Sequence, residues 1–378
     1  MRIGIDARLL SITITGMGRY TAELSRELLN LGDECFLYSP SPLIVGDWSR
    51  SNAHVRANRV RGRPGRMLWM QTMLPYQAAR DQVDVFWGAN HRLPRYLSKS
   101  MARVVTIHDL VWKYAGETMR PLGRMVESYL MPEAIAKADR IIAVSSATGQ
   151  AVEAEFPEAR GKVRVVLSGV TPMAAPLDRV SLLALGIDRP YFLFVGTLEP
   201  RKNLTRLLDA YASLPEAIRV ANQLVIVGGK GWGGVNINQL LQARGLEQYA
   251  VVPGYVSDAQ LSSLYAHARF LALPALYEGF GLPLVEAMAH GVPVLTSNTS
   301  SLPEVAGDAG LLVDPLDVGA IAVGIQRLLG DDAYHAELAA RARPNAARFS
   351  WATAARETRE VFEEAVQERR SILGLGRS

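Results

Sequence analysis

The sequence predicts an α/β protein built from two doubly wound, Rossmann-like domains. Short apolar segments alternate with segments whose apolar residues recur at helical spacing, and this alternation runs through the chain twice. Residues 168–176, which contain prolines and mostly small side chains, separate the two sets and are typical of a linker. The length of 378 residues is also too great for one ordinary core. We therefore predict an N-terminal domain at residues 1–170 and a C-terminal domain at residues 177–350.

The composition is that of a globular protein, with 49% hydrophobic and 21% charged residues. Lysine and arginine exceed aspartate and glutamate by 41 to 37, and this net charge of +4 does not by itself indicate a polyanionic partner. The single cysteine, Cys35, excludes an internal disulfide and fits a reducing compartment. Neither a signal peptide nor an apolar run of about 18 residues is visible, so we expect a cytoplasmic protein whose contact with a membrane, if any, is peripheral at the inner face.

The first domain opens with a strand, a glycine turn and a helix. Residues 2–6 form the apolar strand, and Gly16 and Gly18 lie in a predicted turn over residues 15–20, which a helix follows. A dinucleotide-binding loop would carry a third glycine where Thr21 stands, so the pattern argues against an NAD site. A purely structural turn remains an alternative reading of the two glycines.

A histidine follows one of the later strands of this domain. The strand at residues 103–107 runs directly into His108 and Asp109. Ligands of parallel sheets bind beyond the carboxyl ends of the strands, so His108 is a candidate for ligand contact, and Asp109 could orient its ring or cap the next segment. The alternative for a lone histidine is a structural role. The other strands expected in this domain cover residues 83–87, 140–145 and 162–167. Ser145 and Ser146 are expected to cap a helix, and the alternative is that they line the ligand site.

A run of arginines precedes an apolar segment in the first domain. The apolar segment, residues 67–74, offers Trp69, Met70 and Met73 to one helix face. Such a pairing of charge and apolar surface could dock on anionic lipid, and the alternative is a solvated loop beside a core helix. Nucleic acid is not a predicted partner, because a single aromatic residue provides no repeated stacking platform. The arginines of this run are Arg56, Arg59, Arg61, Arg63 and Arg66.

The second domain begins with a strand at residues 191–195, after which come Gly196 and the adjacent cations Arg201 and Lys202. Cations at the ligand-facing end of a strand can stabilise a diphosphate leaving group. The glycine-rich residues 228–234 lack the Gly-Lys-Ser/Thr of a P-loop. Further expected elements are a helix from about 204, a strand at 224–227, a helix capped by Ser257 or Asp258, strands at 270–273 and from 292, and helices from 318 onward.

Between two of these strands lies a glycine-broken loop that leads into a helix near Pro283. Backbone N–H groups at a helix start bind anions, and Gly279 and Gly281 allow a phosphate to approach the main chain. Glu278 and Glu286 flank this loop, with seven residues between them. One carboxylate can reach a sugar beyond the phosphates and the other a ribose diol before them, so the arrangement suits a nucleotide-sugar.

The nonapeptide at residues 278–286, Glu-Gly-Phe-Gly-Leu-Pro-Leu-Val-Glu, resembles the Glu-x7-Glu motif of retaining glycosyltransferases with the GT-B fold, especially glycosyltransferase family four. The resemblance covers nearly the entire chain and is nearest to bacterial mannosyltransferases of surface-polysaccharide assembly. It includes Gly-Met-Gly-Arg-Tyr at 16–20, Glu-Pro-Arg-Lys-Asn at 199–203 and Ser-Ser-Leu-Pro-Glu-Val-Ala-Gly at 300–307. A GT-B fold implies that the two domains face a deep cleft, with the acceptor on the N-terminal side and the last helix, about 352–367, packing back on the first domain.

The resemblance also implies roles for individual residues. It assigns His108 and Glu278 to the transferred sugar, and Arg201 and Lys202 to the diphosphate. No metal ligand and no cofactor is implied, and no Asp-x-Asp triplet occurs in the sequence. The residues implied to bind the donor are Gly16, Gly18, Gly196, Tyr255, Val256, Gly279, Phe280, Gly281, Leu282 and Glu286.

The implied reaction is transfer of a hexose, with mannose from GDP-mannose as the leading donor, to a hydroxyl of a glycan or lipid-linked acceptor. Retention would follow from attack on the face that the diphosphate leaves, with the leaving phosphate taking the proton, because no carboxylate is a compelling covalent nucleophile. Fold alone does not fix chemistry. A nucleotide-sugar epimerase, a glycogen-type synthase and a non-catalytic nucleotide-sugar-binding protein therefore remain alternatives.

Overall fold

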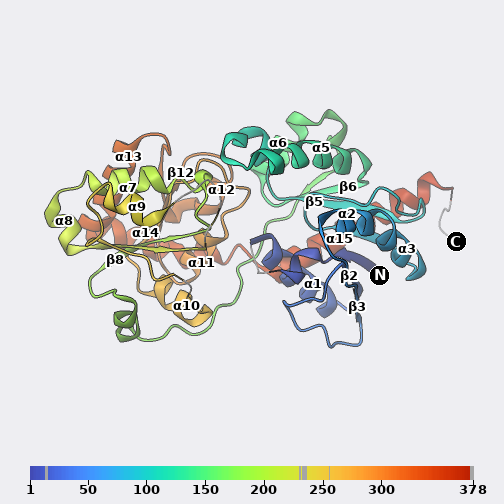
Figure 1. The fold of residues 1–378 in the computed structure, drawn as a ribbon, viewed down its shortest axis with the longest axis horizontal. Helices are drawn as coiled ribbons and strands as arrows, with labels where there is room; N and C mark the ends of the chain where they lie inside the picture. Colours follow the sequence, from blue (N-terminus) through green and yellow to red (C-terminus); the bar gives the residue numbers. More distant parts are fainter. Residues whose placement is uncertain (13–15, 230, 232–235, 255, 375–378) are drawn as a thin grey trace. The chain divides into compact units, whose positions relative to one another are not determined.

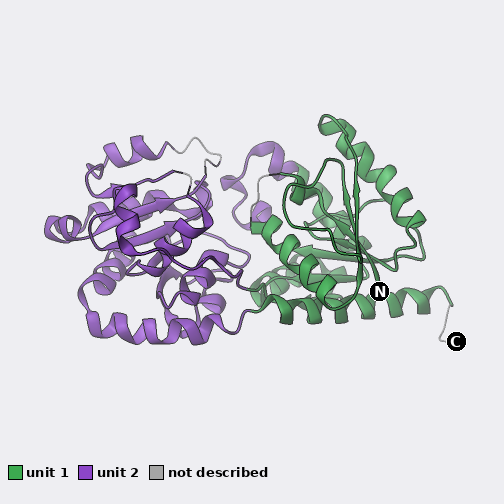
Figure 2. Ribbon diagram, turned by 90° about the horizontal axis from the view of Figure 1, so that it is seen from below, with its two compact units in different colours: residues 1–110, 126–169, 350–378 green, residues 111–125, 170–349 purple. Residues whose placement is uncertain are grey.

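The computed structural model of the chain describes residues 1–12, 16–229, 231, 236–254 and 256–374. It divides into two compact units, shown in green and purple in Figure 2. Unit 1 comprises Met1–Leu110, Val126–Gly169 and Ser350–Ser378, and unit 2 comprises Val111–Met125 and Val170–Phe349. Each unit contains a parallel sheet with helices, which confirms the predicted α/β class with two Rossmann-like domains. The C-terminal segment therefore belongs to unit 1, and Val111–Met125 groups with unit 2.

The sheet of unit 1 has the strand order β3-β2-β1-β4-β5-β6-β7, so the order reverses between β1 and β4. Nearly every residue of the central strands is buried, as expected for a parallel sheet covered on both faces. The strands are β1 (Arg2–Asp6), β2 (Glu34–Ser39), β3 (Ala53–Ala57), β4 (Val85–Gly88), β5 (Ala102–Ile107), β6 (Arg140–Ala143) and β7 (Val163–Val165). The helices are α1 (Gly16–Asn30), α2 (Arg63–Gln71), α3 (Met73–Arg80), α6 (Ser146–Glu155), α15 (Trp351–Ile372) and α5 (Pro121–Lys137), which begins in unit 2; η1 (Arg8–Ser11) and η3 (Pro157–Ala159) are short 3-10 turns.

The sheet of unit 2 repeats this plan with the order β10-β9-β8-β11-β12-β13, which reverses between β8 and β11. Figure 1 labels two of its strands, β8 and β12. Its strands are β8 (Tyr191–Val195), β9 (Gln223–Val227), β10 (Ala250–Val251), β11 (Leu271–Leu273), β12 (Val294–Ser297) and β13 (Gly310–Val313). Its helices are α4 (Val111–Tyr114), α7 (Leu204–Ala212), α8 (Glu216–Ala221), α9 (Ile237–Gln242), α10 (Asp258–Ala266), α11 (Leu282–Ala289), α12 (Leu302–Ala306), α13 (Val318–Gly330) and α14 (Asp332–Ala346). The 3-10 turns are η2 (Gly116–Thr118), η4 (Arg179–Leu185), η5 (Pro200–Lys202) and η6 (Gly307–Ala309).

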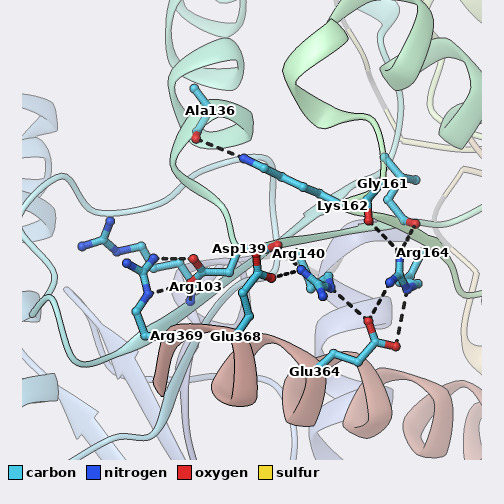
Figure 3. Close-up of polar contacts among 11 residues, drawn as sticks. Arg103, Ala136, Asp139, Arg140, Gly161, Lys162, Arg164, Glu364, Glu368 and Arg369 are labelled. Atoms are coloured by element: carbon cyan, nitrogen blue, oxygen red, sulfur yellow. Dashed lines mark hydrogen bonds and ion pairs between the residues drawn. The ribbon is translucent and has the colours of Figure 1, made fainter. Parts of the chain in front are cut away.

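Helix α15 packs on unit 1 beside α1, β5 and β6. Its apolar face places Trp351 and Phe362 in the core, where Phe362 lies 5.9 Å from the ring of Trp87. Figure 3 shows the polar contacts that join this helix to the sheet. Arg140 pairs with Glu364 at 2.9 Å and also with Glu368, Arg164 pairs with Glu364 at 2.8 Å, and Arg369 pairs with Asp139. The chain's last helix thereby completes the first unit.

The sequence-based prediction misses four strands and misplaces one turn. The strands β2, β3, β10 and β13 were not predicted. Arg56, the first arginine of the run at residues 56–66, lies in β3 with its side chain 2.8 Å from Asp81, so this residue belongs neither to a loop nor to a free basic surface. The predicted turn over residues 15–20 is wrong from Gly16 onward, because α1 begins there. The burial of Tyr20 against His108 and Trp351 explains this early start, since a helical conformation carries that ring into the core.

The apolar face expected on the segment 67–74 is also wrong in part. Trp69 and Met70 are buried, and the indole Nε1 of Trp69 donates to the side-chain oxygen of Asn58 at 2.8 Å. Met73 is exposed and begins the next helix, α3, so the three side chains do not share one helix face. Across the described residues, no helix combines the length and the apolar character needed to cross a membrane.

Candidate active site

The site predicted in the second domain lies where the strand order of its sheet reverses. β8 and β11 are neighbours there, with Leu193 in register with Leu271. The segment after β8 carries Arg201 and Lys202, and the segment after β11 carries Glu278. In doubly wound sheets ligands bind at such a reversal, outside the carboxyl ends of the strands. The topology therefore brings together residues that are more than seventy positions apart in the sequence.

Four charged side chains form what we call the ion cluster: Glu199, Arg201, Lys202 and Glu278. The Glu278 carboxylate lies 2.8 Å from the Arg201 guanidinium and also pairs with the Lys202 ammonium. Arg201 in turn pairs with Glu199 at 3.0 Å. Glu199, Lys202 and Glu278 are each only 7% exposed. Two cations and two carboxylates thus neutralise one another at the strand ends.

Burial and pairing act in opposite directions on these groups. Burial opposes ionisation of Glu278, but Arg201 and Lys202 outweigh it and hold the pKa of this carboxyl below its usual value. Burial raises the pKa of Glu199 despite the neighbouring Arg201. Burial also lowers the pKa of Lys202, against the attraction of Glu278. Glu278 is consequently the carboxylate that most firmly retains its charge.

Asn203 fixes the loop that bears the two cations. Its backbone adopts a left-handed conformation (φ 60°), which asparagine tolerates better than most residues. Its amide nitrogen donates to the carbonyls of Pro274 at 2.9 Å and Pro315 at 2.7 Å. The backbone N–H of Leu276 donates to the carbonyl of Arg201 at 2.8 Å. These bonds tie the loop after β8 to the loops after β11 and β13.

Two serines hold the backbone around Glu278. The hydroxyl oxygen of Ser300 accepts from the Glu278 N–H at 3.1 Å. The hydroxyl of Ser301 donates to the carbonyls of Glu278 at 2.9 Å and Phe280 at 3.2 Å. The carboxylate is therefore presented by a loop whose backbone is bonded on both sides.

Helix α11 begins immediately after this loop. Gly281 is its N-cap residue with φ 98°, a conformation that glycine adopts without strain, and Leu282 is the first helical residue. Gly279 precedes the buried Phe280, whose ring packs edge-on against Phe349 at 5.5 Å. The structure thus confirms the loop-to-helix arrangement that the motif predicts, with Pro283 in the first turn.

Glu286 occupies a separate environment from Glu278. It is 5% exposed inside α11, and the hydroxyl of Tyr265 donates to its Oε2 at 2.8 Å. Val256 is half-buried before α10, and Ser257 forms the predicted cap of that helix. Tyr255, which was also predicted to bind the donor, lies outside the described residues.

Gly196 and Gly228 allow the loops after β8 and β9 to approach closely. A Cβ atom at Gly228 would lie 1.9 Å from the carbonyl oxygen of Gly196, which no side chain could tolerate. A Cβ atom at Gly196 would lie 3.5 Å from Cε of Lys202, which is ordinary contact. The aliphatic part of Lys202 therefore passes over Gly196 on its way to Glu278.

His108 belongs to unit 1, at the carboxyl end of β5. Its Nε2 lies 2.8 Å from the carbonyl oxygen of Ala89, and the ring of Tyr20 packs edge-on against it at 4.7 Å. Burial, together with the nearby His91, lowers the pKa of His108 to about 3. The ring is therefore neutral at physiological pH, and Nε2 carries the proton that the Ala89 carbonyl accepts.

The remaining predicted residues lie on α1, where Gly16 is the first residue and Gly18 is buried in the first turn. Sequence reasoning missed Glu199 and the two serines, although the quoted motifs at 199–203 and 300–307 contain them. It also missed Tyr265 and His91, for which no motif gave a signal. Among the residues that the structure describes, no group of three or more His, Cys, Asp or Glu side chains is arranged to hold a metal ion.

Comparisons with known proteins identify the family of this chain. A family model described as glycosyl transferases group 1 matches residues 183–349, and one described as Glycosyltransferase Family 4 matches residues 14–173. The O-antigen chain mannosyltransferase B of Escherichia coli is 32% identical over a match that covers 96% of this chain and 100% of that protein.

Solved structures share the fold at lower identity. The sucrose-phosphate synthase of Thermosynechococcus elongatus superposes with a TM-score of 0.74 at 23% identity, covering 99% of each chain. Anabaena HepE in complex with UDP and glucose superposes with a TM-score of 0.73 at 19% identity, covering 96% of this chain and 99% of that chain. Together with the two family models and the full-length relative, these likenesses show that the chain belongs to glycosyltransferase family four and has the GT-B fold.

Proposed function

We propose that this glycosyltransferase moves mannose from GDP-mannose to a hydroxyl of a glycan or lipid-linked acceptor with retention of configuration. The observation that carries the proposal is the ion cluster, because Arg201 and Lys202 stand at the strand-order reversal beside the start of α11. Two cations and a helix N-terminus are suited to a diphosphate. The mannosyltransferase from Escherichia coli supports mannose as the sugar, while the HepE complex shows that a protein of this fold takes a uridine nucleotide.

The paired cations also support a reaction without a metal ion. A departing diphosphate gains negative charge, and Arg201, Lys202 and the N-terminal N–H groups of α11 would stabilise that charge. Glu278 would accept a hydrogen bond from a hydroxyl of the sugar, since its pKa is held low by the two cations. A carboxylate held by two cations is a poor covalent nucleophile, which favours same-face displacement with the leaving phosphate as the base.

His108 would contact the transferred sugar. Because its Nε2–H is used by the Ala89 carbonyl, Nδ1 is the ring atom that would accept a hydrogen bond from a sugar hydroxyl. The low pKa of His108, about 3, keeps this nitrogen unprotonated at the pH of the cytoplasm.

A panel of nucleotide-sugars tests the proposal. GDP-mannose should raise the melting temperature most, because a ligand that binds only the native state stabilises it, and mannose should appear on a glycan acceptor with retained configuration by NMR. Release of a rearranged sugar without acceptor would indicate an epimerase. A strict need for a glucan primer would indicate a glycogen-type synthase, and binding without turnover a non-catalytic protein.

Metal independence is a separate prediction. Because the cations of the ion cluster would neutralise the diphosphate, transfer should retain its rate in excess EDTA. The control is a metal-dependent glycosyltransferase assayed in the same buffer, which must lose activity. Loss of transfer that added magnesium restores would show that the diphosphate is neutralised differently.

We also propose a peripheral contact with anionic lipid through α2 and α3. Because Trp69 and Met70 are buried, the exposed apolar residues of α2 and α3 are Met67, Leu68, Met73 and Tyr76. Arg59, Arg61, Arg63 and Arg66 are exposed beside them, and the sequence contains neither Asp nor Glu between residues 56 and 80. Arginines around exposed apolar side chains suit the interface of an anionic bilayer. This surface would place the enzyme at the inner face of the membrane.

Sedimentation with phosphatidylserine vesicles tests this surface. Each arginine near the bilayer contributes about 1 kcal/mol, so changing Arg61, Arg63 and Arg66 to Glu should release the protein, as should high salt. The matched control changes Arg50, Arg160 and Arg356, which are also exposed, to Glu. Equal binding by both triple variants would contradict the proposed surface.

A further inference from the structure

One short segment of unit 1 forms hydrogen bonds with two atoms of His108. This segment, Ala89 to His91, follows β4, the strand next to β5. The carbonyl of Ala89 accepts from the His108 ring at 2.8 Å, and Nε2 of His91 accepts from the His108 backbone N–H at 2.9 Å. Both the ring and the main chain of His108 are therefore positioned by the same three residues.

His91 achieves this in an unusual backbone conformation. Its φ is 64°, in the left-handed region that residues other than glycine seldom adopt. Its own N–H donates to the carbonyl of Thr106 at 3.0 Å, and its side chain is 7% exposed. A strained conformation persists where the surroundings require it, and such residues cluster at functional sites.

Glu127, on α5, lies next to the imidazole ring of His91. Because Nε2 of His91 accepts a hydrogen bond, its proton resides on Nδ1, which lies 3.6 Å from Oε2 of Glu127. Arg92 donates to the other oxygen of Glu127 at 2.5 Å, and Arg8, bound to Asp6, adds positive charge nearby. Burial opposes ionisation of Glu127, but His91 and Arg92 prevail and hold its pKa at about 2. Glu127 is thus a charged carboxylate whose Oε2 faces Nδ1 of His91 at ion-pair distance, where it favours the tautomer with the proton on Nδ1.

We propose that His91 and Glu127 are positioning residues that fix His108 in the tautomer with the proton on Nε2, so that Nδ1 accepts a hydrogen bond from the transferred sugar. The chain of contacts runs from Glu127 to His91, from His91 to the backbone of His108, and from the ring of His108 to Ala89. The part concerning the sugar rests on the function proposed above for His108. The positioning itself is a property of the unliganded protein.

Two substitutions of His91 separate its backbone from its side chain. Asparagine tolerates the left-handed conformation but is too short for its oxygen to reach the His108 N–H. Glutamine reaches about as far as Nε2 and retains the acceptor. His91→Asn should therefore disrupt the positioning of His108, and His91→Gln should largely rescue it.

Nitrogen NMR of histidine-labelled protein reports the tautomer directly, with His108→Gln assigning the signals. In the wild type, His108 should show one protonated and one unprotonated nitrogen from pH 5 to 8. In His91→Asn the two shifts should move toward averaging, and the ring should titrate nearer the ordinary value of about 6.5. Should His91→Asn fail to fold, Glu127→Gln gives a milder change in the same signals. Wild-type His108 shifts in the folded variants would overturn the inference.

Kinetics then distinguishes this inference from the proposed function. A small displacement of a group that contacts the substrate costs rate, so His91→Asn should lower kcat by roughly tenfold to a hundredfold with little change in the affinity for GDP. His91→Gln should recover most of the loss. Altered His108 shifts with unchanged transfer would support the positioning and refute the contact between His108 and the sugar.

Discussion

The carboxyl ends of the two sheets carry different kinds of polar group, although both sheets reverse their strand order in the same way. In unit 2, the strand ends carry the ion cluster, whose four members are charged groups paired with one another. In unit 1, the group that the motifs single out is His108, a buried neutral ring held by a carbonyl. The same strand topology therefore carries charged side chains in unit 2 and a neutral hydrogen-bond acceptor, the His108 ring, in unit 1.

The difference follows from what each site is proposed to hold. A diphosphate requires positive charge, and in the unliganded protein that charge needs a partner, which Glu278 provides. A sugar hydroxyl requires directional hydrogen bonds, which a neutral ring of fixed tautomer supplies. Substitutions in the two units should therefore change different measured quantities.

The largest effect is expected from Lys202→Ala in unit 2. The substitution removes a charge-assisted hydrogen bond of roughly 1.5 to 3 kcal/mol to the diphosphate, so affinity for GDP and for the donor should fall about tenfold to a hundredfold. Turnover should fall further, because charge on the leaving group grows in the transition state. Titration calorimetry and initial rates measure both, with circular dichroism as the control for folding. If turnover fell but affinity for GDP stayed the same, Lys202 would not contact the diphosphate in the ground state.

The next largest effect is a loss of stability at low pH that we expect from His108 in unit 1. The pKa of His108 is about 3 in the folded protein and about 6.5 when unfolded. As pH falls below 6.5, the His108 ring becomes protonated in the unfolded chain but stays neutral in the native state. The unfolded state is therefore stabilised relative to the native state. Between pH 6.5 and 4.5 this amounts to about 2 kcal/mol in the free energy of unfolding.

Urea unfolding of wild type and His108→Gln at these two pH values measures the effect. The variant should lose less stability than the wild type over this interval. His54→Gln, a change at a half-exposed histidine of the edge strand β3, is the matched control and should behave like the wild type. The carboxylates Glu127 and Glu278 have lowered pKa values, so their contributions are lost only below about pH 4.5. An equal loss in all three proteins would refute the assignment to His108.

The smallest expected change in ligand affinity separates the two glutamates of unit 2. Glu278→Gln removes the charge that competes for Arg201 and Lys202, so GDP should bind up to about threefold more tightly while transfer falls strongly. Glu286→Gln should weaken GDP and GDP-mannose equally, because Glu286 is assigned to the ribose. Titration calorimetry with both ligands decides between them. Equal losses of GDP affinity in the two variants would show that the division of roles is wrong.

Local patterns predict much of the fold. The strand β8 and the start of α7 lie where the apolar pattern places them, and Ser145 and Ser257 cap helices as their positions suggest. These features depend on a few consecutive residues and on the direction in which each side chain points. The edge strand β3 was not predicted, because its residues are mostly half-exposed and contain no apolar run.

The sequence alone was enough to predict the family, the two α/β domains and three of the four charged residues of the ion cluster, Arg201, Lys202 and Glu278. It took the folded structure to reveal that Glu278 neutralises Arg201 and Lys202, that Trp69 is buried and that His91 accepts a hydrogen bond from the His108 backbone. The physical reason is that each of these contacts joins segments brought together by strand order or packing. Such contacts leave no periodicity in the chain, because the distance that matters is across the fold and not along the sequence.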